Sequence, residues 1–458
     1  MTRINPIGRV WRLARGALWP IPLLAVTLAV TAGLLLPVLD EALSTADEGS
    51  PLGFVFGGDP GAARDLLAAI AGSLISVTGV TFSLTVVALQ LGSSQYSPRL
   101  LQTFVTDPVV QGTLAQLTGT FVYALTVLRT VRTAEATLDG RAFVPRLSIT
   151  LAFLFALGSV AALVFFLGHL ARMLRVETML RNVHDEAVAT IERTDQNPDD
   201  APPELPGRPG TPVEAQASGF VVAVDEERLV AVARERDLVL VLRPRMGDSV
   251  VRGTPLAHVW PRDGGPVRDP DELADAVTQA VTLSYERTPE EDAAYSVRKI
   301  VDIAGRALSP GINDPTTAVH ALSHLSALLG DLLPRHSPSL ACRDTDGTLR
   351  LVVHRWTAEE LLRLGLEETI EYSSGQPAVL RRIAGLLREL AWRVRGHGLD
   401  RELTALVERA ARLAAETTSV DEREATLWRA AVDDALAGRW SVVPEPGRRP
   451  ATPHAPTS

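Results

Sequence analysis

The stretch LLAAIAGSLISVTGVTFSLTVVALQL at Leu66–Leu91 carries no charged residue and is long enough to cross a bilayer as one helix. At about 100° per residue, its small and polar residues fall on two faces. The first face carries Gly72, Ser76, Gly79, Ser83 and Gln90. The second, nearly opposite, carries Thr78, Thr81 and Thr85. Because lipid tails offer no hydrogen-bonding partner, both faces predict contact with protein or water.

Three further stretches have a similar length and apolar composition. They are Ala17–Leu39, Val109–Leu128 and Leu147–Leu170. The first of these follows several arginines, as the core of a signal peptide would, but its length and the spans after it favour an uncleaved anchor. The sequence therefore predicts an α-helical membrane protein with a four-helix transmembrane domain over residues 1–171, surrounded by the lipid bilayer.

The flanks of the predicted spans indicate an orientation, because arginine concentrates on the cytoplasmic side. Basic residues precede the first span and follow the fourth, whereas the first loop is acidic. We therefore expect a multi-pass protein of the bacterial cell (inner) membrane with both termini in the cytoplasm. One cluster disagrees, since this topology places the third loop outside. Its residues are Arg129, Arg132, Arg141 and Arg146.

The third span repeats the pattern of small and polar residues at steps of four and three. These residues are Gly112, Gln116, Gly119, Tyr123 and Thr126. Close packing of helices within a bundle explains such a pattern. Alternatively, one polar face of the second span lines a hydrated path, since two opposed faces exceed what a single packing contact requires. No acidic or basic residue lies in the middle of a span, so a proton relay or charged gate has no support.

Composition narrows the classes of function. The net charge of -9 argues against a nucleic-acid partner, which would need a basic surface. Lys299 is the only lysine, and Cys342 is the only cysteine, which excludes an intramolecular disulfide and a zinc site built on several thiolates. Neither a GxSxG motif nor a glycine-rich phosphate loop occurs. We therefore assign no catalytic residue and no cofactor.

After the membrane domain the chain changes character several times. We expect a helical extension into the cytoplasm at 172–193 and a linker rich in proline and acidic residues at 194–212. A small α+β element follows at 213–265, where GFVVAV and DLVLVLRPR are typical of strands. Amphipathic helices then predict a helical cytoplasmic domain at 266–440, and residues 441–458 are expected to be a disordered tail.

The segment ALSPGINDPTTA at Ala307–Ala318 interrupts the helical domain with a turn and a new helix start. The candidate residues for a ligand or subunit contact are Arg298, Asp302 and Arg306 on the preceding helix, and Asn313, Asp314, Thr316 and Thr317 at the turn. A helix start suits a small anion such as phosphate or carboxylate, but a capped, salt-bridged turn explains the same residues. His320 and His324 have a metal-binding spacing, yet no second motif supports a metal site.

Three segments together resemble a known family. They are VTFSLTVVALQLGSSQYSPRLL at Val80–Leu101, YALTVLRTVR at Tyr123–Arg132 and DIAGRALSPGINDPTTA at Asp302–Ala318. They are similar to the bacterial family of predicted membrane proteins called domain of unknown function 2254. The resemblance covers most of the chain and implies a polytopic membrane protein. It implies no activity and no catalytic residues.

Three functional hypotheses remain open at this point. The leading one is a channel-like or transport-associated protein, a homo-oligomer whose cytoplasmic region regulates the membrane part. The second is a membrane-anchored sensor or scaffold that binds a partner through its soluble region and transports nothing. An enzyme acting at the membrane surface is the least favoured.

Overall fold

The computed structural model describes residues 18–44, 56–95, 105, 107–133, 142–194, 205–287, 292–335, 339–416 and 420–440. The chain divides into two compact units, Met1–Thr178 and Met179–Ser458. Each unit has its own buried core, and each is described below by itself.

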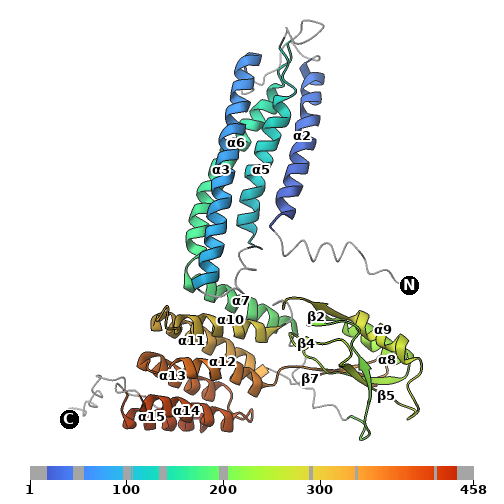
Figure 1. Cartoon of the computed structure of the whole chain (residues 1–458), viewed down its shortest axis with the longest axis vertical. Helices are drawn as coiled ribbons and strands as arrows, with labels where there is room; N and C mark the ends of the chain where they lie inside the picture. Colours follow the sequence, from blue (N-terminus) through green and yellow to red (C-terminus); the bar gives the residue numbers. More distant parts are fainter. Residues whose placement is uncertain are drawn as a thin grey trace, which may run out of the picture. The chain divides into compact units, whose positions relative to one another are not determined.

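The first unit is a bundle of four long helices (Figure 1). They are α2 (Pro20–Ser44), α3 (Pro60–Gln95), α5 (Pro108–Leu128) and α6 (Arg146–Met173). Three stretches are long and apolar enough to cross a membrane: Pro20–Ala42, Pro60–Gly92 and Arg146–Met173. Three of the four predicted spans therefore form helices that are long and apolar enough to cross a membrane. The third predicted span forms α5, whose two glutamines and several threonines make it more polar.

Helix α5 lies at the centre of the bundle, because α2, α3 and α6 all pack against it. Its start follows from the local sequence. Asp107 precedes Pro108, and one of its carboxylate oxygens accepts the backbone N–H groups of Val109 and Val110 at 2.9 and 3.0 Å. The central position explains the composition, since a helix covered by three others need not present an apolar surface to lipid.

The second unit contains two sheets. Their strands are β1 (Thr211–Glu214), β2 (Gly219–Val224), β3 (Leu238–Leu242), β4 (Ser249–Val250), β5 (Pro255–Pro261), β6 (Val281–Ser284), β7 (Ser339–Arg343) and β8 (Leu349–His354). One sheet has the order β1-β5-β3-β8-β7, and the other has the order β4-β2-β6. The pair β3–β8 is parallel and the remaining pairs are antiparallel.

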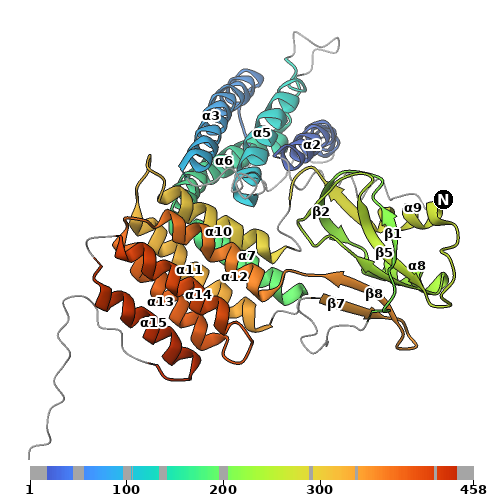
Figure 2. The same cartoon turned by 60° about the horizontal axis from the view of Figure 1, so that its bottom comes forward.

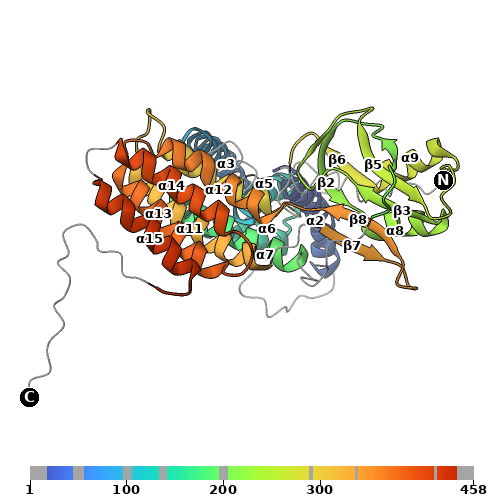
Figure 3. The same ribbon diagram turned by 90° about the horizontal axis from the view of Figure 1, so that it is seen from below.

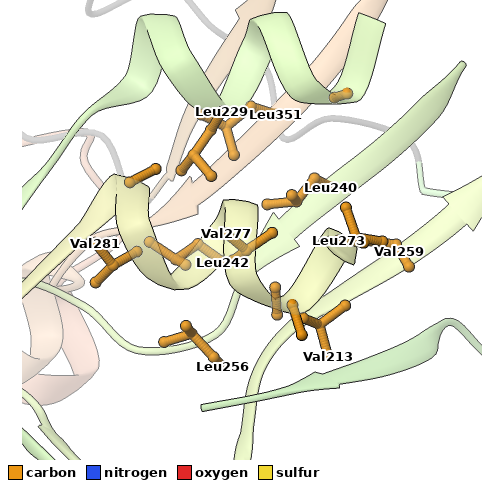
Figure 4. Close-up of a cluster of buried hydrophobic side chains, with 14 of the residues drawn as sticks. Val213, Leu229, Leu240, Leu242, Leu256, Val259, Leu273, Val277, Val281 and Leu351 are labelled. Atoms are coloured by element: carbon orange, nitrogen blue, oxygen red, sulfur yellow. The ribbon is translucent and has the colours of Figure 1, made fainter. Parts of the chain in front are cut away.

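Two helices cover the sheet region, α8 (Glu226–Glu235) and α9 (Pro270–Ala280) (Figure 2). Their apolar faces pack with strand residues into one core. Figure 4 shows Leu229 of α8 and Leu273 and Val277 of α9 together with strand residues such as Leu240. The α+β character predicted for this region is confirmed, although strands β6, β7 and β8 come from the stretch in which the sequence predicted helices.

The remaining helices of the second unit stack beside the sheets (Figure 3). They are α7 (Val176–Thr194), α10 (Ala293–Ala307), α11 (Pro315–Leu332), α12 (Ala358–Tyr372), α13 (Pro377–Arg393), α14 (Asp400–Ala415) and α15 (Glu422–Leu436). The contacts define two rows, α10–α12–α14 and α11–α13–α15. Amphipathic faces with buried Leu, Ile and Ala explain this stacking.

Candidate functional site

The two predicted faces of α3 have opposite environments in the first unit. The glycine and serine face points out of the bundle, since all of its predicted residues are exposed. They are Gly72, Ser76, Gly79, Ser83 and Gln90. A Cβ atom added at Gly72 or Gly79 would meet nothing within 4 Å. We call these five residues the outward face of α3.

The threonine face of α3 points into the bundle. Thr81 and Thr85 are 0% and 4% exposed, and Thr78 is half-buried. Each hydroxyl donates to the carbonyl four residues earlier in its own helix, at 2.7–2.8 Å. Their polar groups are therefore satisfied within α3, and their methyl groups are left to pack against neighbouring helices.

The polar residues predicted on α5 lie largely inside the bundle. Gly112, Gln116, Gly119 and Tyr123 line a cavity of about 320 Å³ together with residues of α2 and Phe155 of α6. The Gln116 amide donates to the Phe155 carbonyl at 3.2 Å and to the Thr120 hydroxyl at 3.3 Å. Ser159 of α6 donates to the same hydroxyl at 3.1 Å. These bonds join α5 to α6 at mid-helix.

A buried aspartate, unforeseen from the sequence, closes one end of this bundle. Asp40 near the end of α2 is 7% exposed. Its carboxylate accepts the backbone N–H groups of Leu147 and Ser148 at 3.0 and 2.9 Å and the Ser148 hydroxyl at 2.7 Å. Asp40 therefore caps α6 from another helix, a place that Pro145 cannot fill. The Tyr123 hydroxyl donates to the Ser148 carbonyl at 3.1 Å, which adds α5 to the junction.

At the other end of α5, the cap residue also joins α6. The second carboxylate oxygen of Asp107 lies 3.0 Å from Nε2 of His169. Side-chain contacts thus link α5 to α6 near both ends and in the middle. On α3, by comparison, Arg64 donates to the Val131 carbonyl at 3.0 Å beyond the end of α5.

In the second unit, the candidate turn is organised by its own residues. Asp314 accepts the N–H groups of Thr316 and Thr317 at 3.1 Å, and the Thr317 hydroxyl at 2.6 Å. Asn313 has a left-handed backbone with φ of 50° and accepts a bond from Gln376 at 2.8 Å. The bonds from Thr316 and Thr317 lower the pKa of Asp314, and the Thr317 hydroxyl contributes most. The donors at the start of α11 are therefore engaged by a carboxylate of the chain itself.

The predicted face of α10 is a salt-bridged surface. Arg298 donates to Asp302 at 3.0 Å and to Glu368 of α12 at 2.6 Å. The bond to Glu368 is the main reason why the pKa of Arg298 is raised. Arg306 is exposed at the end of α10. The two arginines therefore have different surroundings, although their spacing puts them on one face.

The histidines of α11 meet a histidine of α7. The ring of His324 lies 6.2 Å from that of His184, and His320 is exposed. Burial lowers the pKa of His324, with His184, His320 and Arg181 adding to the effect. Within the described ranges, no three His, Cys, Asp or Glu residues are grouped so as to hold a metal ion.

The single lysine ties α7 to α10. Lys299 is 1% exposed, and its Nζ lies 2.8 Å from a carboxylate oxygen of Glu186. The same ammonium sits 5.1 Å from the centre of the Tyr295 ring. Composition singled out this residue, but no local pattern indicates a partner 113 positions away.

Comparison with known proteins supports the resemblance seen in the sequence. A family model described as "Predicted membrane protein (DUF2254)" matches residues 15–389. The uncharacterised protein Rv1290c of Mycobacterium tuberculosis is 32% identical over 382 residues, covering 82% of this chain and 72% of the relative. The uncharacterised protein Mb1321c of Mycobacterium bovis matches with the same identity and coverage. No solved structure matches.

Proposed function

The chain belongs to this family of predicted membrane proteins, and we propose that it works as a homo-oligomer whose α3 helices meet through their outward faces. The observation that carries the proposal is that all five outward-face residues are exposed in the subunit. The exposed surface of α6, by comparison, is mostly apolar, as at Leu157, Val160 and Val164. That contrast distinguishes a lipid-facing surface from one suited to protein or water.

The free energy that would be lost if the outward face of α3 met lipid tails supports assembly through this face. A side-chain amide or hydroxyl in hydrocarbon loses its hydrogen bonds to water, at roughly 2–7 kcal/mol for each unsatisfied group. Gln90 and Ser83 would incur this cost if the outward face met lipid tails. Gly72 and Gly79 leave room for a close approach of another helix, as small residues spaced by three or four positions do in membrane dimers.

From this contact follows the proposed activity, a channel-like or transport-associated role. Several α3 helices around one axis would place Ser76, Ser83 and Gln90 beside a hydrated path. No ring of charged side chains would line such a path. It would therefore suit small uncharged solutes or discriminate only weakly among solutes. The second unit would regulate it, since α7 follows α6 after Leu174 and Arg175.

The membrane topology is part of the proposal. We place α5 across the membrane with the three apolar helices, because its polar groups are used inside the bundle. Four crossings put both termini in the cytoplasm. A single cysteine at Thr133 tests this in a Cys342→Ser chain. Labelling from the periplasm by a membrane-impermeant maleimide supports the topology, and labelling only from the cytoplasm contradicts it.

A scaffold without transport is the second candidate. The spacing Gly72, Ser76, Gly79, Ser83 favours it, because small residues at such steps let helices pack closely enough to exclude water. In that case the outward face joins subunits and the second unit binds a partner.

Single-cysteine chains separate these candidates, since Cys342 is the only native cysteine. In a Cys342→Ser background, cysteine replaces Ser76 or Ser83, and Val160 on the lipid-facing side of α6 serves as the matched control. Disulfide formation between subunits at positions 76 and 83, but not 160, supports assembly through α3. Solute flux in liposomes that a charged methanethiosulfonate blocks at position 83 then supports a path.

Ser83→Leu gives a second readout. A path should close while the oligomer persists, whereas a scaffold should show no flux before or after the change. If neither position 76 nor position 83 forms cross-links in native membranes, α3 does not join subunits and both forms of the proposal fail.

A further inference from the structure

A second cavity lies in the soluble unit, between the strands and the helical stack. It measures about 90 Å³ and receives residues from α8, α10, α12 and the end of β8. One water needs roughly 10–15 Å³ by this measure, so the cavity has room for a ligand of about half a dozen non-hydrogen atoms. Its apolar wall includes Met246, Trp356 and Leu361. Its polar side includes Glu226, His354 and Arg355.

Two charged side chains that line this cavity lack the ion pairs that the neighbouring charged side chains form. Nearby arginines touch their carboxylates: Arg287 lies 2.5 Å from Asp292, and Arg245 lies 2.5 Å from Glu360. Glu226 and Arg355, in contrast, form no ion pair with each other or with another of the described residues, although the charge of Arg355 acts on Glu226. The Cys342 thiol donates to a carboxylate oxygen of Glu226 at 4.0 Å.

The charges of Glu226 and Arg355 nevertheless interact without a direct contact. Burial raises the pKa of Glu226, and the charge of Arg355 opposes that rise. Asp292 also lines the cavity, but Arg287 and the N–H of Tyr295 already engage its carboxylate. Burial, with the nearby Arg243 and Arg245, lowers the pKa of His354, which favours a neutral ring at pH 7. The Glu226 carboxylate and the Arg355 guanidinium therefore both line the cavity without forming an ion pair with each other.

We propose that this cavity binds a small zwitterion of amino-acid size. Arg355 would take the carboxylate in a two-pronged contact, Glu226 would take the ammonium, and Met246 and Leu361 would pack against a small apolar substituent. A simple anion would leave Glu226 without a partner, and a simple cation would do the same to Arg355. A ligand with both charges avoids leaving a half-buried charge uncompensated.

The site is independent of how α3 assembles, so it can be tested separately. Full-length protein in detergent micelles is titrated with glycine, L-alanine, acetate, methylammonium and inorganic phosphate, and binding is measured by calorimetry. We expect glycine or alanine to bind at least about tenfold more tightly than acetate or methylammonium, because each half-ligand loses one charged hydrogen bond. Tighter binding of acetate or phosphate would overturn the proposal. The absence of detectable amino-acid binding at 10 mM would overturn it as well, since a dissociation constant of that size corresponds to only roughly 2.7 kcal/mol of binding free energy.

Variants identify the site. Arg355→Gln and Glu226→Gln should each weaken glycine binding by about tenfold or more, whereas Arg268→Gln, an arginine with an 88% exposed side chain, should leave it unchanged. Met246→Trp fills the cavity without altering a charge and should also abolish binding. If Arg355→Gln does not fold, the result for Met246→Trp decides. Unchanged glycine affinity in Met246→Trp, or in both charge variants, would place the ligand elsewhere and refute the assignment.

Discussion

Helices α3 and α5 carry the same kind of pattern, glycines and polar residues at steps of three and four, and use it in opposite ways. On α5 the residues face inward, where Gln116 and Tyr123 bond to α6. On α3 the glycine and serine residues face outward and leave open space at Gly72 and Gly79. Side-chain periodicity alone therefore shows that a membrane helix has a special face. Neighbouring helices decide whether that face builds the subunit or joins it to something else.

The largest expected effect is at the inward side, where Asp40 caps α6. Asp40→Ala removes three hydrogen bonds to a buried carboxylate and should lower the free energy of unfolding by about 3 kcal/mol. Asp40→Asn keeps one acceptor and should cost about half as much. Unfolding of the purified protein by titration with SDS measures both.

The exposed Asp65 on α3 provides the matched control. Asp65→Ala should change the free energy of unfolding by less than about 0.5 kcal/mol, as surface substitutions commonly do. If Asp40→Ala were as well tolerated as Asp65→Ala, the junction of α2 and α6 would not support the bundle, and the contrast between inner and outer polar residues would weaken.

Substitution of Gly33, which packs inside the bundle, and of Gly79, on the outward face of α3, extends the comparison. A Cβ at Gly33 would lie 2.7 Å from Cβ of Thr126, so α2 and α5 must move apart to accept it. Gly33→Ala should therefore cost about 2 kcal/mol. Gly79→Ala should leave the subunit at least as stable, because nothing lies within 4 Å. SDS titration reports subunit stability, and cross-linking reports assembly, which we expect Gly79→Ala to weaken. Equal stability losses in the two variants would contradict this view of α3.

Some of these features follow from sequence and others do not, for a physical reason. Local signals succeed: Asp107 followed by Pro108 starts α5, and the amphipathic pattern of the predicted helical domain corresponds to helices such as α12 (Ala358–Tyr372). Partners far along the chain are not encoded locally. Asp40 bonds to a residue 108 positions away, and Lys299 to one 113 positions away. The candidate residues of α3 were visible in sequence, but their orientation depends on packing.

Strand β8 shows the same limit in the second unit. LRLVVH at Leu349–His354 is a short apolar run that local periodicity leaves ambiguous between helix and strand. It follows β7 in an antiparallel hairpin, which the turn residues Asp346 and Gly347 could have indicated. Its parallel partner β3, in contrast, lies more than a hundred residues earlier, and no local pattern indicates that pairing. The residues of the cavity in the second unit were missed because no local pattern indicates that the end of β8 brings His354, Arg355 and Trp356 to the same cavity as Glu226.

The two glutamines offer a smaller but cleaner contrast. Gln116→Leu on α5 removes the bonds to Phe155 and Thr120 and should cost about 1 kcal/mol in the SDS titration. Gln90→Leu on α3 should cost the subunit nothing, since its side chain is exposed, but it should alter cross-linking between subunits. A reversal, with Gln90→Leu destabilising the isolated subunit and Gln116→Leu silent, would exchange the roles assigned to the two helices.

The smallest effect is expected from Tyr123→Phe. The ring keeps its edge-to-face contact with Phe155, whose centre is 5.4 Å away, and loses one hydrogen bond to the Ser148 carbonyl. The cost should be about 0.5 kcal/mol, typical of one hydrogen bond between membrane helices. Tyr285→Phe, at a 92% exposed residue, should cost nothing.

Because Tyr123 and Asp40 both bond to Ser148, Tyr123→Phe combined with Asp40→Asn should depart from additivity. Additive losses would mean that α2 and α5 hold α6 independently. Coupling of about 0.5 kcal/mol or more would mean that Ser148 joins three helices into one polar junction, a feature that the outward face of α3 lacks within the described subunit.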